Sequence, residues 1–206
     1  MLISLGEIRQ SSEIAALIFA SEPKLLSFLF GGDTECLSYL TKACKQSYGQ
    51  FSANSHHIVK LADKSTMAFS EHPTAGICAA WHANMAVEFQ QGTLSSFKSF
   101  LSTEQIIHLL AYKDALDDCF APPKQHQLCL GHISVAAGYR KMGVASALIE
   151  HAVSVAAKLS KTELILDAEA LNTNAVDCYL KAGFKVTQQS TFAATQQLFS
   201  RMSLII

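Results

Sequence analysis

The residues best suited to chemistry as a group lie in the segment 139–145, which reads Tyr-Arg-Lys-Met-Gly-Val-Ala. It separates an apolar stretch typical of a strand from a long apolar pattern typical of a helix. Backbone amides at the start of such a helix converge on one point, where they bind phosphate groups. Arg140 adds a cation, and the small Gly143 and Ala145 let the main chain approach a bulky ligand. The segment predicts a site for a phosphate-bearing cofactor, although a plain strand-to-helix turn has the same sequence features.

A second motif follows, with the spacing Asn-x-x-Ala-x-x-x-Tyr-x-x-x-Gly-Phe from Asn172 to Phe184. The order of strand, Arg-x-x-Gly-x-Ala, helix, strand and this second motif resembles the GNAT acetyltransferase superfamily over about residues 128–186. The sequence departs from the usual family pattern at Ala137, where proline is common, and at Lys141 and Ala145, where glycine is common.

The resemblance implies acetyl-CoA as a cosubstrate. In this family the strand before the loop separates from the next strand, and its free main-chain groups pair with the pantetheine arm. That role falls on Ile133, Ser134 and Val135, and the amide of Val135 is expected to stabilise the thioester oxyanion. The diphosphate is expected at the loop and the first helical turn, which comprise Arg140, Lys141, Met142, Gly143, Val144, Ala145 and Ser146.

The resemblance also assigns a proton donor. The family tyrosine corresponds to Tyr179, which is expected to protonate the leaving thiolate, because a phenol of pKa about 10 is a suitable acid for a thiolate of pKa about 8.5. A half-buried tyrosine that contacts only backbone or water is the alternative. Asn172 is expected to bond the pantetheine, to cap the following helix, or to do both.

The general base is less clearly marked. His132 lies on the cofactor strand and is our tentative choice, because its ordinary pKa near 6.5 suits proton acceptance from an amine. Strand alternation places it on the opposite face from Ile133, so it could also point into the fold. Asp167 and Glu169, at the end of the next strand, are alternatives. The other histidines, including His56, His57, His72 and His82, show no metal-binding pattern, and we predict no metal.

Composition restricts the class of protein. The chain has 206 residues, half of them hydrophobic, and a formal net charge of −1, which argues against general affinity for nucleic acid or an anionic membrane. We expect one domain over residues 1–206. The six cysteines form no C-x-x-C pair and are expected to be reduced and mostly buried. With neither a signal peptide nor a spanning segment, the sequence predicts a soluble cytoplasmic protein.

Hydrophobic periodicity predicts an α/β (α+β) fold with a mixed, mostly antiparallel sheet and flanking helices. Helices are expected over about 11–20, 23–30 and 33–49, with Asp33 or Thr34 as a cap, and later over 144–159 and 173–182. Strands are expected at about 57–62, 66–69, 74–81, 128–135, 163–168 and 197–206, with a turn at 63–65. Residues 7–9 are expected to end a short strand, and residues 184–186 to start one. Residues 84–123 are expected to form a helical insertion that ends at Pro122-Pro123.

These observations favour an N-acetyltransferase that transfers an acetyl group from acetyl-CoA to an amine-bearing small molecule or peptide by direct attack in a ternary complex. The alternative is a non-catalytic acyl-CoA-binding module with a regulatory or interaction role. A nucleotide-binding protein is weaker, because the loop lacks the P-loop and dinucleotide-binding motifs. Either a monomer or a homodimer is compatible with the sequence.

Overall fold

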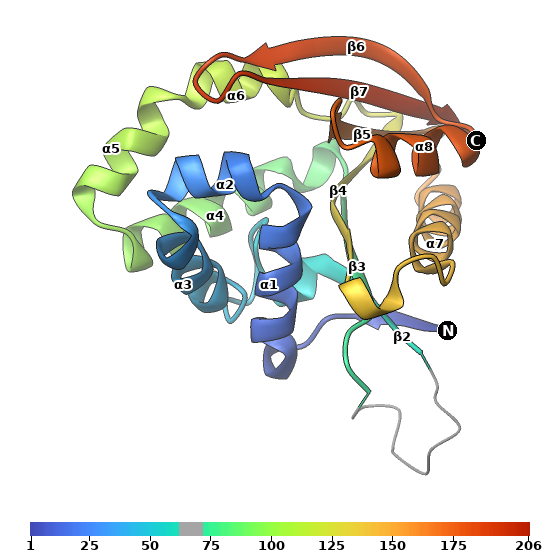
Figure 1. The fold of residues 1–206 in the computed structure, drawn as a ribbon, viewed down its shortest axis with the longest axis horizontal. Helices are drawn as coiled ribbons and strands as arrows, with labels where there is room; N and C mark the ends of the chain where they lie inside the picture. The colour runs from blue at the N-terminus through green and yellow to red at the C-terminus, as the bar shows by residue number, and fades with distance from the viewer. Residues whose placement is uncertain (62–71) are drawn as a thin grey trace.

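The computed structural model describes residues 1–61 and 72–206. Seven strands form one sheet in the order β1-β2-β3-β4-β5-β7-β6, with helices on both of its sides (Figure 1). All neighbouring strands are antiparallel except β4 and β5, so the predicted mostly antiparallel sheet is confirmed. The strands are β1 (Leu2–Leu5), β2 (His56–Lys60), β3 (Gly76–Trp81), β4 (Gln127–Val135), β5 (Glu163–Glu169), β6 (Lys185–Phe192) and β7 (Gln197–Ile205).

Three N-terminal helices cover one face of the sheet, and they are α1 (Ser11–Ser21), α2 (Pro23–Phe30) and α3 (Asp33–Ala43). Pro23 occupies the first position of α2, where its missing amide proton removes no helical hydrogen bond. The apolar sides of these helices form one core with β2 and β3 side chains such as Ile58 and Ile77. The three predicted N-terminal helices are therefore confirmed.

The predicted helical insertion is also confirmed. Between β3 and β4 the chain forms α4 (Ala86–Phe100), α5 (Thr103–Ala111) and α6 (Lys113–Cys119). Helix α4 packs against α3 through the hydroxyl groups of Tyr39 and Ser96, which are 2.7 Å apart in a buried contact. The Gln50 amide, in the loop before β2, donates to Thr93 Oγ1 of α4 at 3.0 Å. The insertion is thus fixed to the loop that leads into β2.

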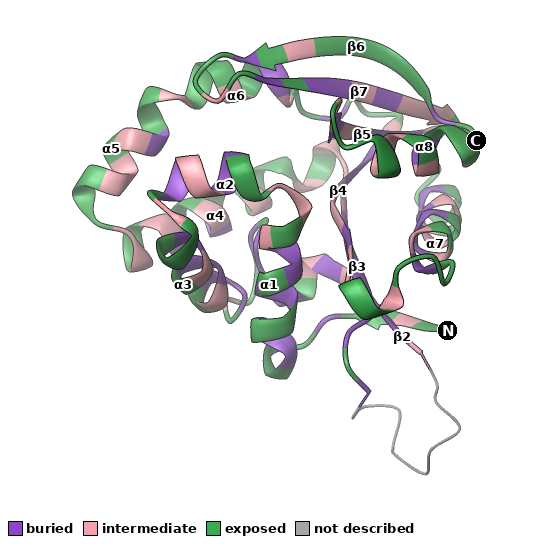
Figure 2. Ribbon diagram, in the orientation of Figure 1, coloured by how far each residue is buried: buried purple, intermediate pink, exposed green. Residues whose placement is uncertain are grey.

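The opposite face is covered by α7 (Val144–Lys158) and α8 (Thr173–Lys181). The side of α7 that faces the sheet is buried, whereas much of α8 and β6 is exposed (Figure 2). Leu148, Ile149, Ala152 and Ala156 are buried at helical spacing, so the predicted core-facing stripe of α7 is confirmed. Strands β6 and β7 form the predicted C-terminal hairpin.

Several predicted boundaries were wrong. Residues 7–9 do not end a strand: β1 finishes at Leu5, and Ile8–Gln10 form a 3-10 turn in which Gln10 and Glu7 cap each other. Helix α3 ends at Ala43 rather than near Gly49, and Gly32, not Asp33 or Thr34, is its N-cap residue. The predicted turn at 63–65 and strand at 66–69 lie outside the described residues. No helix in the described parts of the chain combines the length and apolarity needed to cross a membrane.

Candidate functional site

The sheet opens between β4 and β5. These strands pair only from Gln127↔Glu163 to Leu130↔Leu166, and beyond that point β5 continues beside β7 while β4 continues beside β3. The final residues of β4 therefore have no strand on their β5 side. This is the separation that the sequence resemblance predicts for residues 133–135.

The main chain of Val135 faces this opening. The amide of the next residue, Ala136, donates to the carbonyl oxygen of Ala75 on the β3 side at 2.9 Å. Because successive residues of a strand turn their main-chain groups to opposite edges, the amide and carbonyl of Val135 point toward the β5 side. Ile133 has the same parity, whereas Ser134 faces β3, with Ile77 as its register partner. Two of the three predicted strand residues therefore present main-chain groups to the opening.

A continuous run of amides follows β4. No described residue accepts a hydrogen bond from the amides of residues 141–146. Helix α7 begins at Val144 after Gly143, whose φ of 79° is readily adopted only by glycine. The first three of its amides, at Val144, Ala145 and Ser146, have no intrahelical acceptor. The predicted loop therefore presents several unpaired donors at the positive end of the helix dipole.

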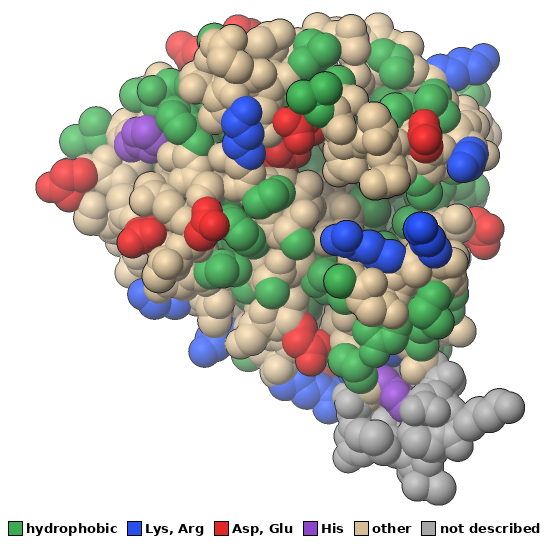
Figure 3. Space-filling view, viewed as in Figure 1, with side chains coloured by type: hydrophobic (Ala, Val, Ile, Leu, Met, Phe, Trp, Pro, Cys, Tyr) green, Lys and Arg blue, Asp and Glu red, His purple; other side chains and the backbone are tan. Residues whose placement is uncertain are grey.

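The cationic residues of this loop are exposed. Arg140 Nε donates to the carbonyl oxygen of Val135 at 3.3 Å, which keeps the guanidinium beside the end of β4. Lys141 has a φ of 62°, a left-handed conformation in a non-glycine residue, and Met142 is 51% exposed. Acidic and basic side chains are interspersed on the face of the molecule drawn in Figure 3.

Tyr179 lies on α8 and is buried, packed edge-on against Phe184 with ring centroids 6.0 Å apart. It belongs to the core between α7 and the sheet. Burial raises the pKa of its phenol above the ordinary value, so the hydroxyl group remains protonated at neutral pH. No described group forms a hydrogen bond with this hydroxyl, which leaves its proton available.

Asn172 caps α8, since its side-chain oxygen accepts from the Ala175 amide at 3.3 Å. The predicted capping role is confirmed.

His132 lies in a β-bulge, where the register between β3 and β4 shifts between Ile77 and Ala79. Its φ of 49° belongs to the left-handed region and re-aims the side chain. Ile133 packs in the core beneath α7, whereas the His132 ring stacks on Phe51 in the core beneath α1–α3, with centroids 5.5 Å apart. The two residues therefore lie on opposite faces of the sheet, as predicted.

The two acidic alternatives differ in their surroundings. Asp167 forms a two-pronged ion pair with Arg201, with contacts of 2.9 and 2.8 Å, and Arg201 also donates to the Ala121 carbonyl. This pairing engages both carboxylate oxygens of Asp167. Glu169 is partly buried and close enough to Glu22 for the two charges to interact.

Sequence reasoning missed the partners of two histidines. His56 bonds His132, and His57 bonds His151 of α7 at 3.1 Å. These contacts join positions 76 and 94 residues apart, and no local motif marks them. Within the described residues no group of three or more potential metal ligands is found.

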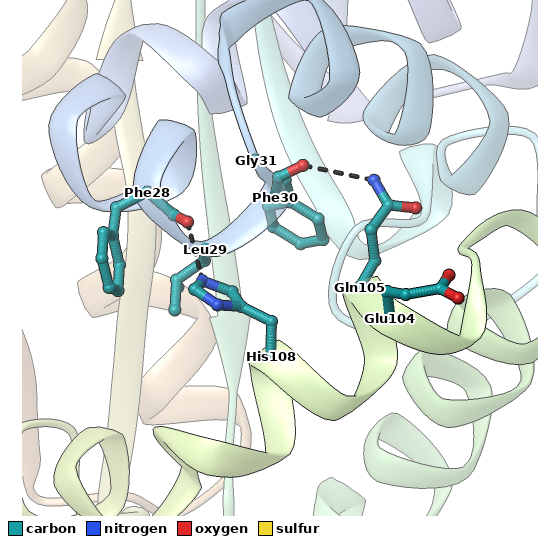
Figure 4. A pocket seen from close by; sticks show the side chains of 7 residues that line it. All are labelled: Phe28, Leu29, Phe30, Gly31, Glu104, Gln105 and His108. Carbon is teal, nitrogen blue, oxygen red and sulfur yellow. Dashed lines mark hydrogen bonds between the residues drawn. The ribbon is translucent and has the colours of Figure 1, made fainter.

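A separate hollow of about 220 Å³ lies between α2 and α5 (Figure 4). In it His108 and Gln105 bond the carbonyl oxygens of Phe28 and Phe30, at 3.0 and 3.3 Å. None of the predicted site residues lines this hollow. The candidate site is the β4–β5 opening with its adjoining loop.

Comparisons with known proteins agree with this geometry. Residues 94–184 match the family described as "Acetyltransferase (GNAT) family". A solved N-acetyltransferase from Staphylococcus aureus Mu50 has the same fold, with a TM-score of 0.70, 15% identity and coverage of 99% of this chain and 100% of that one. A structure described as an acetyltransferase gives a TM-score of 0.68 at 19% identity and covers 100% of both chains.

A third structure, Rv2747 from Mycobacterium tuberculosis in complex with CoA and NLQ, gives a TM-score of 0.54 at 9% identity and covers 100% of this chain and 99% of that one. No curated protein sequence matches the chain. Residues 94–184 thus resemble the GNAT acetyltransferase family, and the whole chain shares its fold with solved acetyltransferases, as the sequence predicts.

Proposed function

We propose that the protein is an acetyl-CoA-dependent N-acetyltransferase in which the acceptor amine attacks the thioester directly. The observation that carries this proposal is the β4–β5 opening, toward which the main chain of Ile133 and Val135 is turned. An extended pantetheine arm in this opening would pair with these groups as an added strand does. The unbonded amides of 141–146 follow the same strand, where a diphosphate would accept them.

The residues around the opening support a division of roles. The Val135 amide would donate to the thioester oxygen as negative charge develops there. Arg140 would contribute a cation to the diphosphate, and Asn172 can still donate through Nδ2 while its oxygen caps α8. Tyr179 would protonate the departing thiolate, because its raised pKa keeps it in the acid form. His132 would take the proton that the amine loses, although burial lowers its pKa to about 3 and so weakens it as a base.

The acceptor class follows from the same reasoning. We infer an amine-bearing small molecule or a peptide, which enters from the face covered by α1–α6 because α7 and the diphosphate loop occupy the other face. The S. aureus neighbour named as an N-acetyltransferase and the neighbour solved with CoA support nitrogen as the acceptor atom and CoA as the donor's carrier.

The decisive experiment has two arms. Calorimetry with acetyl-CoA measures coenzyme binding, and release of free CoA thiol with a panel of small amines and peptides measures transfer. We expect binding and amine-dependent thiol release. Binding without release across the panel would favour the non-catalytic acyl-CoA-binding module, and absence of binding would refute both functions.

A further inference from the structure

Two imidazole rings meet across the middle of the sheet. His56 lies on β2 and His132 on β4, and His56 Nε2 is 3.0 Å from His132 Nδ1. Strand β3 runs between them, and the residue it places opposite both His56 and Gly131 is the small Ala79. The rings are nearly parallel, with an interplanar angle of 16° and centroids 5.2 Å apart. The bulge at His132 is what brings its ring to this face of the sheet.

The hydrogen bonds of this pair fix which nitrogens carry protons. His56 Nδ1 is 2.8 Å from the carbonyl oxygen of Ser52. A carbonyl oxygen can only accept, so His56 Nδ1 must donate. In a neutral His56 the other nitrogen, Nε2, then has a lone pair, and His132 Nδ1 must donate to it. The lone pair of a neutral His132 is therefore on Nε2.

The surroundings keep both rings neutral and leave Nε2 of His132 accessible. Burial lowers the pKa of His56 to about 4 and that of His132 to about 3. The ionisable groups of the described chain that act on these rings are other histidines, since His57 acts on His56 and His56 acts on His132. His132 is partly exposed, and no group in residues 1–61 or 72–206 bonds its Nε2. Phe51 covers one face of its ring.

We propose that His56 is a positioning residue, which holds His132 in the tautomer whose Nε2 accepts the proton of the acceptor amine. This inference rests on the proposed N-acetyltransferase function. The amine nitrogen forms a bond to the acetyl carbon, and the proton it loses passes to His132 Nε2. The carbon–sulfur bond breaks, and the sulfur takes the Tyr179 proton. The His132 imidazolium keeps its Nδ1 bond to His56 and later returns a proton to the Tyr179 oxygen through water.

Variants at position 56 separate positioning from packing. In His56→Phe an aromatic ring remains, but the nitrogen that accepts the hydrogen bond from His132 is lost. We expect kcat to fall roughly 10- to 100-fold with unchanged affinity for acetyl-CoA. In His56→Gln the side-chain amide can donate to Ser52 and accept from His132, and we expect most of kcat to return. His57→Phe, on the opposite face beside His151, is the matched control and should keep kcat close to that of the wild type.

The effects of the His56 and His132 substitutions on kcat should not add in the double variant, which distinguishes positioning from a packing role. If His56 acts only through His132, the double variant with His132→Phe should be no slower than His132→Phe alone. Further slowing in the double variant, or equal rates for His56→Phe and the wild type, would overturn the positioning role. A wild-type protein that binds acetyl-CoA but acetylates no amine would instead refute the proposed function.

Nitrogen-15 NMR of the wild-type histidines tests the same inference without a substitution. Near neutral pH we expect His132 to carry its proton on Nδ1 and to have an unprotonated Nε2. A proton on Nε2, with Nδ1 unprotonated, would refute the assignment even if His56→Phe failed to fold.

Discussion

The two faces of the sheet are built on different principles. On the α7 face, the proposed diphosphate loop offers main-chain amides of the consecutive residues 141–146, and its conformation depends on Gly143, which has a positive φ. On the α1–α6 face, the His56–His132 pair depends on side chains from separate strands, and on Phe51 and Ser52 of a loop. A site made of consecutive backbone amides can be recognised in the sequence as a short motif. A site made of side chains from distant parts of the chain cannot.

Removing the Tyr179 hydroxyl should produce the largest effect. The ring of Tyr179→Phe can keep its contact with Phe184, but the thiolate loses its proton donor. We expect kcat to fall roughly 100-fold, measured by thiol release, while the dissociation constant for acetyl-CoA stays within about twofold of the wild-type value. An unchanged kcat would mean that the α7 face contributes binding but no proton transfer.

The insertion's contact with the loop before β2 is the next test. A Cβ on Gly92 would lie 2.8 Å from the amide nitrogen of Gly49 and 2.6 Å from the Tyr48 ring. We expect Gly92→Ala to lower the free energy of unfolding by about 1–3 kcal/mol, because overpacking outweighs the better helix propensity of alanine. Urea denaturation measures this. A Cβ on Gly138 would meet nothing within 4 Å, so Gly138→Ala is the control and should be nearly neutral.

The backbone of the proposed diphosphate loop should be sensitive to a single methyl group. Gly143 has a φ of 79°, a conformation that costs an L-residue about 1–2 kcal/mol. We expect Gly143→Ala to weaken acetyl-CoA binding by roughly 5- to 30-fold, measured by calorimetry, with a smaller change in kcat. Equal affinity for the variant and the wild type would show that the loop amides do not bind the coenzyme. Gly138→Ala again serves as the control.

The smallest expected effect concerns acid stability on the histidine face. Burial raises the pKa of Glu22 to about 7, whereas it lowers those of His56 and His132 to about 4 and 3. The neutral forms of His56 and His132 contribute to the stability of the folded protein above pH 6.5. This contribution is lost as the pH falls toward their lowered pKa values. The contribution of Glu22 has the opposite sign, since it is present below pH 4.5 and is lost as the pH rises through 7.

Glu22→Gln should therefore steepen the loss of stability on acidification from about pH 7 to about pH 5, by on the order of 1 kcal/mol. Urea denaturation at several pH values measures the slope. The same slope in Glu22→Gln and the wild type would mean that the Glu22 carboxyl is not protonated preferentially in the folded state.

Sequence periodicity predicts most of this fold because its main signals are local. The α7 stripe, the Asn172 cap and the helical insertion each depend on residues close together in the chain. The expected strand end at 7–9 and helix end at Gly49 were wrong, because the capping box of Glu7 and Gln10 forms a 3-10 turn and because turns already follow Ala43. The interaction of His56 with His132 was not predictable, because it requires a bulge in β4 and the small Ala79 between the rings.

The short pairing between β4 and β5 has a mechanical consequence. Four register pairs, from Gln127↔Glu163 to Leu130↔Leu166, join the two halves of the sheet. Bending of the sheet should concentrate along this line, because the antiparallel ladders that flank it, β3–β4 and β5–β7, have more register pairs. Any molecule laid into the opening would cross-link the halves, so occupancy and rigidity of the whole protein should rise together.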